Sequence, residues 1–174
     1  MRQDLPPIAL SVRQPSAWAI IHGGKDIENR SLGSVRAGRM DCRTICIHAA
    51  IGLKEAEYNW SVYKFQPNGV MIPRPDALPR RAIIGTVDVV DIVDHSDSPW
   101  FGGPMGLVLQ NPTPIDPIPC TGELGYFEWH PDGDVAEPLP WMRKWGRNGQ
   151  DLQTQDLFDD LPTAFKTAPP RPYK

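Results

Sequence analysis

The sequence has no proline between Ser16 and Gln66, although the chain of 174 residues contains 20 prolines. Nearly all of these prolines lie after Gln66. Proline removes a backbone donor and clashes with the preceding helical turn, so long helices cannot form where it recurs. This distribution excludes helical bundles and coiled coils, and it makes repeated strand-helix-strand units hard to fit into the second half.

Long apolar runs are also missing. The longest in the N-terminal half, Ala17–Ile21, is far shorter than the roughly 20 residues that span a membrane. The N-terminus lacks a basic region followed by an apolar core, which is the pattern of a secretion signal. We therefore expect a cytoplasmic protein with no membrane contact.

Cysteine is scarce, and the three cysteines are odd in number, which argues against the disulfide framework of a secreted protein. Cys42, Cys46 and His48 would share one face of a strand, but no fourth protein ligand lies nearby in the sequence. We expect ordinary buried thiols, with no metal and no other cofactor.

Hydrophobic residues make up 40% of the chain, enough for a core, and the length suits one domain. We predict a domain over residues 1–145 and a polar, proline-rich tail over residues 146–174. The net charge of −3 conceals an asymmetry, because Lys and Arg exceed Asp and Glu only in the first half. Either this half attracts polyanions, or its charges form a solvated mixed face.

Alternating and β-branched segments predict strands, and breaker residues separate them. The predicted strands cover 8–12, 44–48, 81–93, 106–110 and 124–129, with 25–30 extended. A short helix is predicted from Pro15 to Gly23-Gly24 and a second over 53–64, while 111–119, with four prolines, is an extended edge or a loop. Gly85 is a candidate bulge. These elements favour an α+β fold, a small closed or partly open barrel of five to six strands flanked by two or three short helices.

Three charged side chains stand close together after the first helix. On an extended segment Glu28 and Arg30 point to the same side, and Lys25 at the helix exit can fold back over that side. Burial or a nearby cation lowers the pKa of a lysine, which can then act as a base or nucleophile, whereas a carboxylate raises it. Either the group carries chemistry, or it is an ion-pair cluster that locks the helix to the strand.

The segment Gly23–Arg30 matches the Gly-x-Lys-x-x-Glu-x-Arg signature of ASCH domains, a family of the PUA-like superfamily. The preceding Leu10–Pro15 and the strand segment from Gly38 to Ala50 also resemble this family, and the resemblance covers roughly residues 8–130.

The resemblance implies a small β-barrel whose cleft, between barrel and helices, receives RNA or a nucleotide-derived ligand. Lys25, Glu28 and Arg30 are the positions that carry over. Some relatives only bind nucleic acid, some hydrolyse amide-modified nucleosides such as acetylated cytidine, and some cleave RNA. In the amidohydrolase branch the matching lysine works with a threonine at the position that Glu28 occupies here.

Three further side chains are candidates for the site. Many relatives have Trp where Ser16 stands; Trp18 is expected in the core, and Trp100, expected to be exposed, is the candidate for stacking on a ligand. His48 is either a proton-transfer group or structural. Arg13 precedes a helix N-terminus, so it either reaches a phosphate or pairs with an acid.

The end of the chain offers two more candidates. Trp141–Trp145 is either a nucleic-acid contact or, as we favour, a terminal turn that clamps the barrel. Leu157 and Phe158 are either an anchor that folds back or a site for a protein partner. We rank three functions: first a module that binds RNA or a nucleotide-derived ligand, then a hydrolase that uses Lys25 and Glu28, and finally a non-catalytic adaptor that recruits a partner through the tail.

Overall fold

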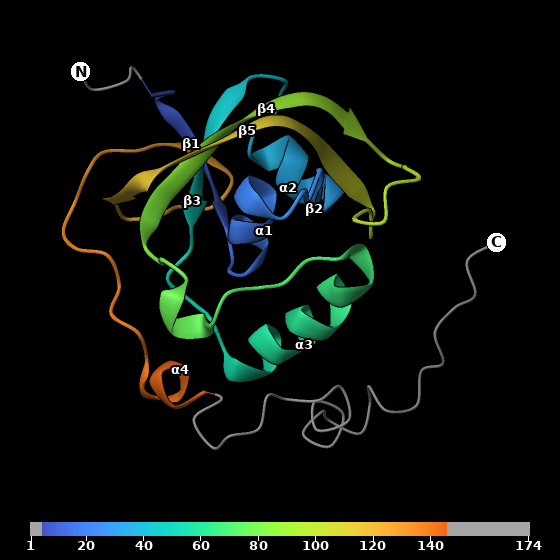
Figure 1. The fold of residues 1–174 in the computed structure, drawn as a ribbon. Coiled ribbons are helices and arrows are strands. Elements are labelled where there is room, and N and C mark those ends of the chain that lie inside the picture. Colours follow the sequence, from blue (N-terminus) through green and yellow to red (C-terminus); the bar gives the residue numbers. More distant parts are fainter. Residues whose placement is uncertain (1–4, 146–174) are drawn as a thin grey trace.

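The chain folds into a mixed α+β structure in the computed structural model, which describes residues 5–145. Within this range six strands form one curled sheet, a half-barrel, with short helices around it (Figure 1). The strands are β1 (Ile8–Val12), β2 (Ile27–Arg30), β3 (Thr44–Ala49), β4 (Ala82–Val93), β5 (Met105–Pro119) and β6 (Tyr126–Glu128). The helices are α1 (Ser16–His22), α2 (Leu32–Ala37), α3 (Glu55–Phe65) and α4 (Pro140–Lys144), with 3-10 turns η1 (Gln66–Asn68) and η2 (Pro75–Ala77). The predicted fold class is confirmed.

The sheet curls around α1. Its strand order is β2-β5-β4-β3-β1-β6, in which β1 and β3 are parallel and the other pairs antiparallel. On β3, alternation places Ile45 and Ile47 in the core with α1, whereas Cys46 belongs to a smaller cluster that also contains Cys120. Figure 1 shows β4 and β5 arching over α1, with α3 below it. The space between the sheet and α1 therefore holds the main core.

The proline-rich segment 111–119 is not a loop but the second half of strand β5. It pairs with β4 through contacts such as Thr86 with Thr113. Strand β2 pairs with β5 only as far as Val108, so within residues 5–145 no strand pairs with the outer edge of this half of β5. Proline is tolerated on such an edge because no neighbouring strand needs its missing N–H. The predicted extended edge is thus correct, and strand β5 is longer than predicted.

A second, smaller core joins α3 to the end of the described chain. Tyr58 is fully buried there, and its hydroxyl donates to the Pro73 carbonyl at 2.8 Å. Trp141 and Trp145 both pack on the Tyr58 ring. The predicted clamp therefore fastens α4 to α3 rather than to the barrel. Helix α3 buries Tyr58 and Phe65.

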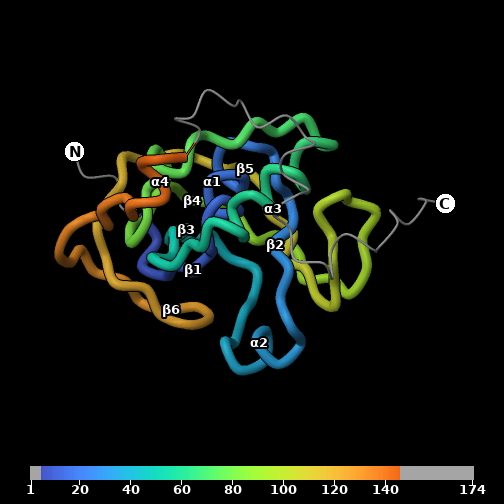
Figure 2. Tube along the Cα trace, turned by 90° about the horizontal axis from the view of Figure 1, so that it is seen from below, coloured from blue at the N-terminus to red at the C-terminus, as the bar shows by residue number. Residues whose placement is uncertain are grey.

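Helix α2 was not predicted. None of its side chains is buried, and Figure 2 shows its connection between β2 and β3 standing away from the body. Ser31 caps its N-terminus by accepting a hydrogen bond from the Ser34 amide at 3.0 Å.

Helix α1 is the short helix that the sequence predicted after the first strand. It begins at Ser16, one residue after Pro15. No helix within residues 5–145 is long and apolar enough to cross a membrane.

Gly85 lies at an irregularity of the sheet, as predicted. The register between β4 and β5 shifts between Ile83 and Gly85. A Cβ at Gly85 would lie 2.6 Å from Ile21 Cδ1 and 2.7 Å from the Thr113 carbonyl oxygen. We therefore expect Gly85→Ala to lower the free energy of unfolding by about 1–3 kcal/mol through overpacking, measured by urea denaturation.

A matched control is Gly33→Ala on α2, where a Cβ would meet nothing closer than 4.0 Å. This change should leave the free energy of unfolding equal or slightly higher, because alanine favours the helix. Equal effects of the two substitutions would contradict the close packing at Gly85.

Candidate functional site

Lys25, Glu28 and Arg30 form one buried ion-pair cluster. Lys25 Nζ lies 3.4 Å from Glu28 Oε2, and Arg30 Nη2 lies 3.3 Å from Glu28 Oε1. The side chains of Lys25, Glu28 and Arg30 are 5%, 12% and 18% exposed, respectively. The predicted convergence is correct, because Glu28 and Arg30 share one side of β2 and Lys25 enters from the exit of α1. Glu28 is the shared acceptor of both cations.

The Lys25 ammonium group is held in a largely apolar environment. It also donates to the Ile27 carbonyl, and its Nζ lies 5.8 Å from the centroid of the Trp100 ring. Burial, the largest influence, lowers the pKa of Lys25 below the usual 10.5, although Glu28 opposes this shift. A lysine with a lowered pKa is neutral more often at moderate pH and can then accept a proton.

A small cavity adjoins the lysine. Its volume is about 100 Å³, and it lies between α1 and strands β4 and β5. Its lining consists of Ile20, Gly24, Lys25, Asp26, Val87, Leu109 and Pro112. Lys25 is the one cation of that lining. The cavity therefore presents one cation, Lys25, and one carboxylate, Asp26, in an otherwise uncharged lining between barrel and helix.

Arg30 also closes the open side of the half-barrel. Its Nη2 donates to the Ser11 carbonyl at 2.8 Å and so bridges the edge strand β2 to β1. Its Nε is buried and has no hydrogen-bond partner within residues 5–145. Buried polar atoms are normally paired, so this atom is an exception. Arg30 thus links β2 to β1 through Nη2 and, within the described residues, keeps an unpaired N–H at Nε.

Trp100 is not the exposed aromatic that the sequence predicted. It is 7% exposed and packs with Ala19, Ile27 and Phe65. Its ring meets that of Phe65 edge-on, with centroids 4.9 Å apart. Trp100 therefore contributes to the wall beside Lys25 and offers no open face for stacking on a base. Trp18, expected in the core, is partly buried between the same cluster and that of Tyr58.

Arg13 pairs with an acid. Its Nη2 lies 2.6 Å from Glu57 Oε2 on α3, and both side chains remain partly exposed. Of the two predicted roles, the structure shows this one. Arg13 is not among the residues that line the Lys25 cavity.

His48 is buried on the opposite face of β3 from α1. Its Nδ1 lies 2.8 Å from Ser11 Oγ and its Nε2 3.2 Å from the Cys120 carbonyl oxygen. It is 2% exposed and packs edge-on against Phe127. His48 is therefore separated from the Lys25 cavity and fits a structural role. Within residues 5–145 no three His, Cys, Asp or Glu side chains gather as a metal site would require.

The burial of His48 predicts a loss of stability in acid. Burial, the largest cause, lowers the pKa of His48 below 6.5, so the unfolded chain binds its proton more readily than the folded one. Stability from neutral His48 is then complete above pH 6.5 and falls as the pH drops below that value. The loss is at most about 1.4 kcal/mol per pH unit. Urea denaturation at pH 7 and pH 5 measures it.

His48→Gln is the control, because glutamine keeps polar atoms but does not titrate. The wild type should lose more stability between the two pH values than this variant. Equal losses would show that other groups cause the acid sensitivity.

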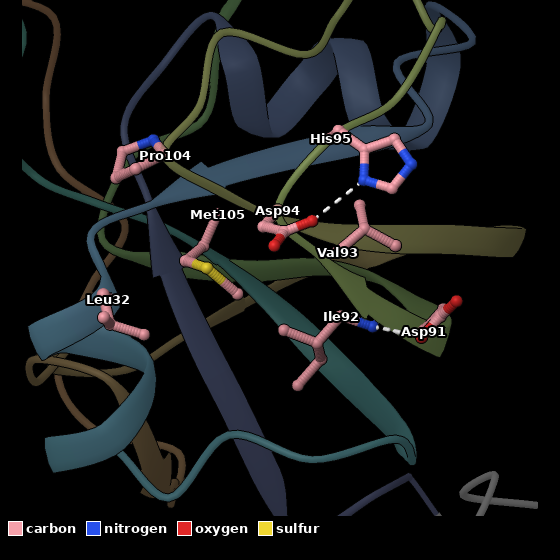
Figure 3. A pocket seen from close by; sticks show the side chains of 8 residues that line it. All are labelled: Leu32, Asp91, Ile92, Val93, Asp94, His95, Pro104 and Met105. Atoms are coloured by element: carbon pink, nitrogen blue, oxygen red, sulfur yellow. Dashed lines mark hydrogen bonds and ion pairs between the residues drawn. The ribbon is translucent and has the colours of Figure 1, made fainter.

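A larger groove of about 610 Å³ lies where β4 ends and β5 begins (Figure 3). Its lining is Leu32, Asp91, Ile92, Val93, Asp94, His95, Pro104 and Met105. Asp94 pairs with His95 at its rim, at 2.9 Å. None of the predicted site residues lines this groove. Its acidic rim makes it a poor surface for nucleic acid.

Asp26, Asn29 and Ser98 join the surroundings of Lys25 although the sequence pattern did not indicate them. Asp26 and Asn29 lie in the same segment as Lys25, Glu28 and Arg30. Their hydrogen-bond partners, Ser98 and Trp100, lie about 70 residues further along the chain, so local sequence patterns do not reveal them. The alternation of β2 alone would have placed Asn29 on the side opposite Glu28. The predicted partner site at Leu157 and Phe158 lies outside the described residues.

Comparison with known proteins adds no relative. No family model matches the chain, and a search of curated proteins finds no match.

Proposed function

We propose that this protein binds RNA or a nucleotide-derived ligand in the cleft where Lys25 lies, between the half-barrel and α1. The observation that carries the proposal is the position of Lys25, a buried cation that lines a cavity and is backed by Glu28 and Arg30. A cation in a low-dielectric wall attracts a phosphate or a polar base edge more strongly than an exposed one. The resemblance of Gly23–Arg30 to the ASCH signature supports the same ligand class.

The outer surface offers a route for a polyanion. Arg36 and Arg39 are exposed on and just after α2, and neither forms an ion pair within the described residues. Such cations contribute sequence-independent attraction to phosphates. RNA binding should therefore weaken steeply as the salt concentration rises.

The test is binding of a labelled panel of single-stranded RNAs and nucleosides at low and high salt. We expect binding at low salt that Lys25→Ala and Arg30→Ala both weaken, whereas Lys144→Ala on α4 leaves it unchanged. No binding at low salt, or binding that neither site variant alters, would overturn the proposal.

A second candidate is hydrolysis of a modified nucleoside or of RNA. The lowered pKa of Lys25 favours it, because a neutral amine can take a proton from an attacking water or hydroxyl. Glu28, which accepts from Lys25 Nζ at 3.4 Å, would orient that amine. Turnover of acetylated cytidine and of single-stranded RNA tests this candidate. No product, or equal product from wild type and Lys25→Ala, would exclude it.

A further inference from the structure

The loop that joins β4 to β5, residues 94–104, is tied to strand β2 by one amide side chain. Asn29 Nδ2 donates to the Trp100 carbonyl at 2.8 Å, and the Gly102 amide donates to Asn29 Oδ1 at 2.7 Å. Asn29 therefore uses its donor and its acceptor on the same loop, on either side of Phe101. Two such bonds to backbone groups fix the local course of the chain.

A second tie lies just before the first. Ser98 Oγ donates to Asp26 Oδ1 at 2.5 Å and accepts from the Trp100 amide at 3.2 Å. Asp26 and Asn29 lie on either side of Ile27 and Glu28, so both ties start from the short segment that follows Lys25. The loop is thus fastened at Ser98, Trp100 and Gly102.

These ties determine where the Trp100 side chain goes. Its ring enters the cluster with Ala19, Ile27 and Phe65 and becomes the aromatic neighbour of Lys25 Nζ, 5.8 Å away. We infer that Asn29 and Ser98 are positioning residues that hold Trp100 as the apolar wall of Lys25 and so set the chemistry of this amine. The inference rests on the proposed function, in which Lys25 is the group that meets the ligand.

The charged groups around Lys25 set the direction of the expected change. Glu28 and Asp26 raise its pKa, Lys64 of α3 lowers it, and burial lowers it most. Opening the loop would admit water to Nζ while leaving Glu28 and Lys64 in place. Lys25 should then retain its proton to a higher pH.

The experiment uses the full chain without RNA or nucleoside. Competitive acetylation with acetic anhydride, read by mass spectrometry of the Lys25 peptide, gives the titration midpoint of Lys25 between about pH 6 and 11. Hydrogen exchange of the amides of 98–102 reports whether the loop has opened. The variants are Asn29→Ala and Ser98→Ala, and Asn68→Ala in η1 is the control, since Asn68 is exposed and remote in sequence from both ties.

We expect faster exchange in the loop and a midpoint about one pH unit higher in both site variants, within the range that burial shifts a lysine. The control should match wild type. An opened loop with an unchanged midpoint would overturn the inference, and so would a loop that stays closed in both variants. Because no ligand is present, failure of RNA binding would refute the proposed function without altering this result.

Discussion

Lys25→Met is expected to weaken ligand binding about 10- to 100-fold while the protein stays folded. One hydrogen bond from a charged group contributes ~1.5–3 kcal/mol, which corresponds to this loss of affinity. Methionine has a similar length and packs well against aromatic rings, so it can occupy the space beside Trp100. Glu28 retains Arg30 as a partner, 3.3 Å away, so the substitution leaves no unpaired carboxylate.

The free energy of unfolding of Lys25→Met should depend on pH differently from that of the wild type. The pKa of Lys25 is lower in the folded state than in the unfolded chain, so the charged form costs stability at neutral pH. That cost is relieved as the pH rises through the folded pKa toward 10.5. Lys25→Met removes the titration, and its stability at pH 7 should lie within about 1 kcal/mol of wild type, because the lost bond to Ile27 offsets the relief.

Fluorescence anisotropy with labelled RNA and urea denaturation at pH 7 together test this prediction. Lys144→Met, an exposed lysine on α4, is the matched control for both measurements. Unchanged affinity in Lys25→Met would contradict a role for Lys25 in binding. A large loss of stability would instead assign the lysine a structural role.

Unlike Lys25→Met, Glu28→Gln should destabilise the fold and lower the free energy of unfolding by ~3–5 kcal/mol. Removing one partner of a buried ion pair leaves an uncompensated charge, and Glu28 is the shared partner of two cations. Lys25 and Arg30 would then face each other in a site where at most 18% of either side chain is exposed. Guanidinium denaturation at neutral pH measures the loss.

The matched control is Glu57→Gln, which neutralises the acid of the exposed pair with Arg13. An exposed pair contributes little, so a change below about 1 kcal/mol is expected. Glutamine can still accept the hydrogen bond that Glu57 takes from the Lys54 amide. If both substitutions cost the same, the buried cluster does not stabilise the fold in the way proposed.

Local rules were sufficient for part of the site. The period of two along an extended segment predicts that Glu28 and Arg30 share a side, and glycines after a short helix predict where Lys25 emerges. Strand positions followed from the same alternation and from β-branched runs. These features depend only on neighbours in sequence, so one sequence is enough to predict them.

The features that could not be predicted from the sequence depend on contacts between distant residues or leave no periodic pattern in the sequence. Trp100 is buried because Asn29 and Ser98 fix its loop, and the pairing of Asn29 with Trp100 joins residues 71 positions apart. Helix α2 has no buried side chain and thus no apolar periodicity to detect. For the second half of β5 the sequence left an extended edge and a loop as alternatives, because its prolines fit either one.

The proline-bearing edge of β5 has a consequence for how the molecules behave toward one another. A free strand edge is a template on which a strand of a second molecule can pair, which leads to aggregation. Pro112, Pro114, Pro117 and Pro119 have no amide N–H, so this segment offers fewer donors to a second strand. We therefore expect these prolines to limit strand pairing between molecules along this edge of the sheet.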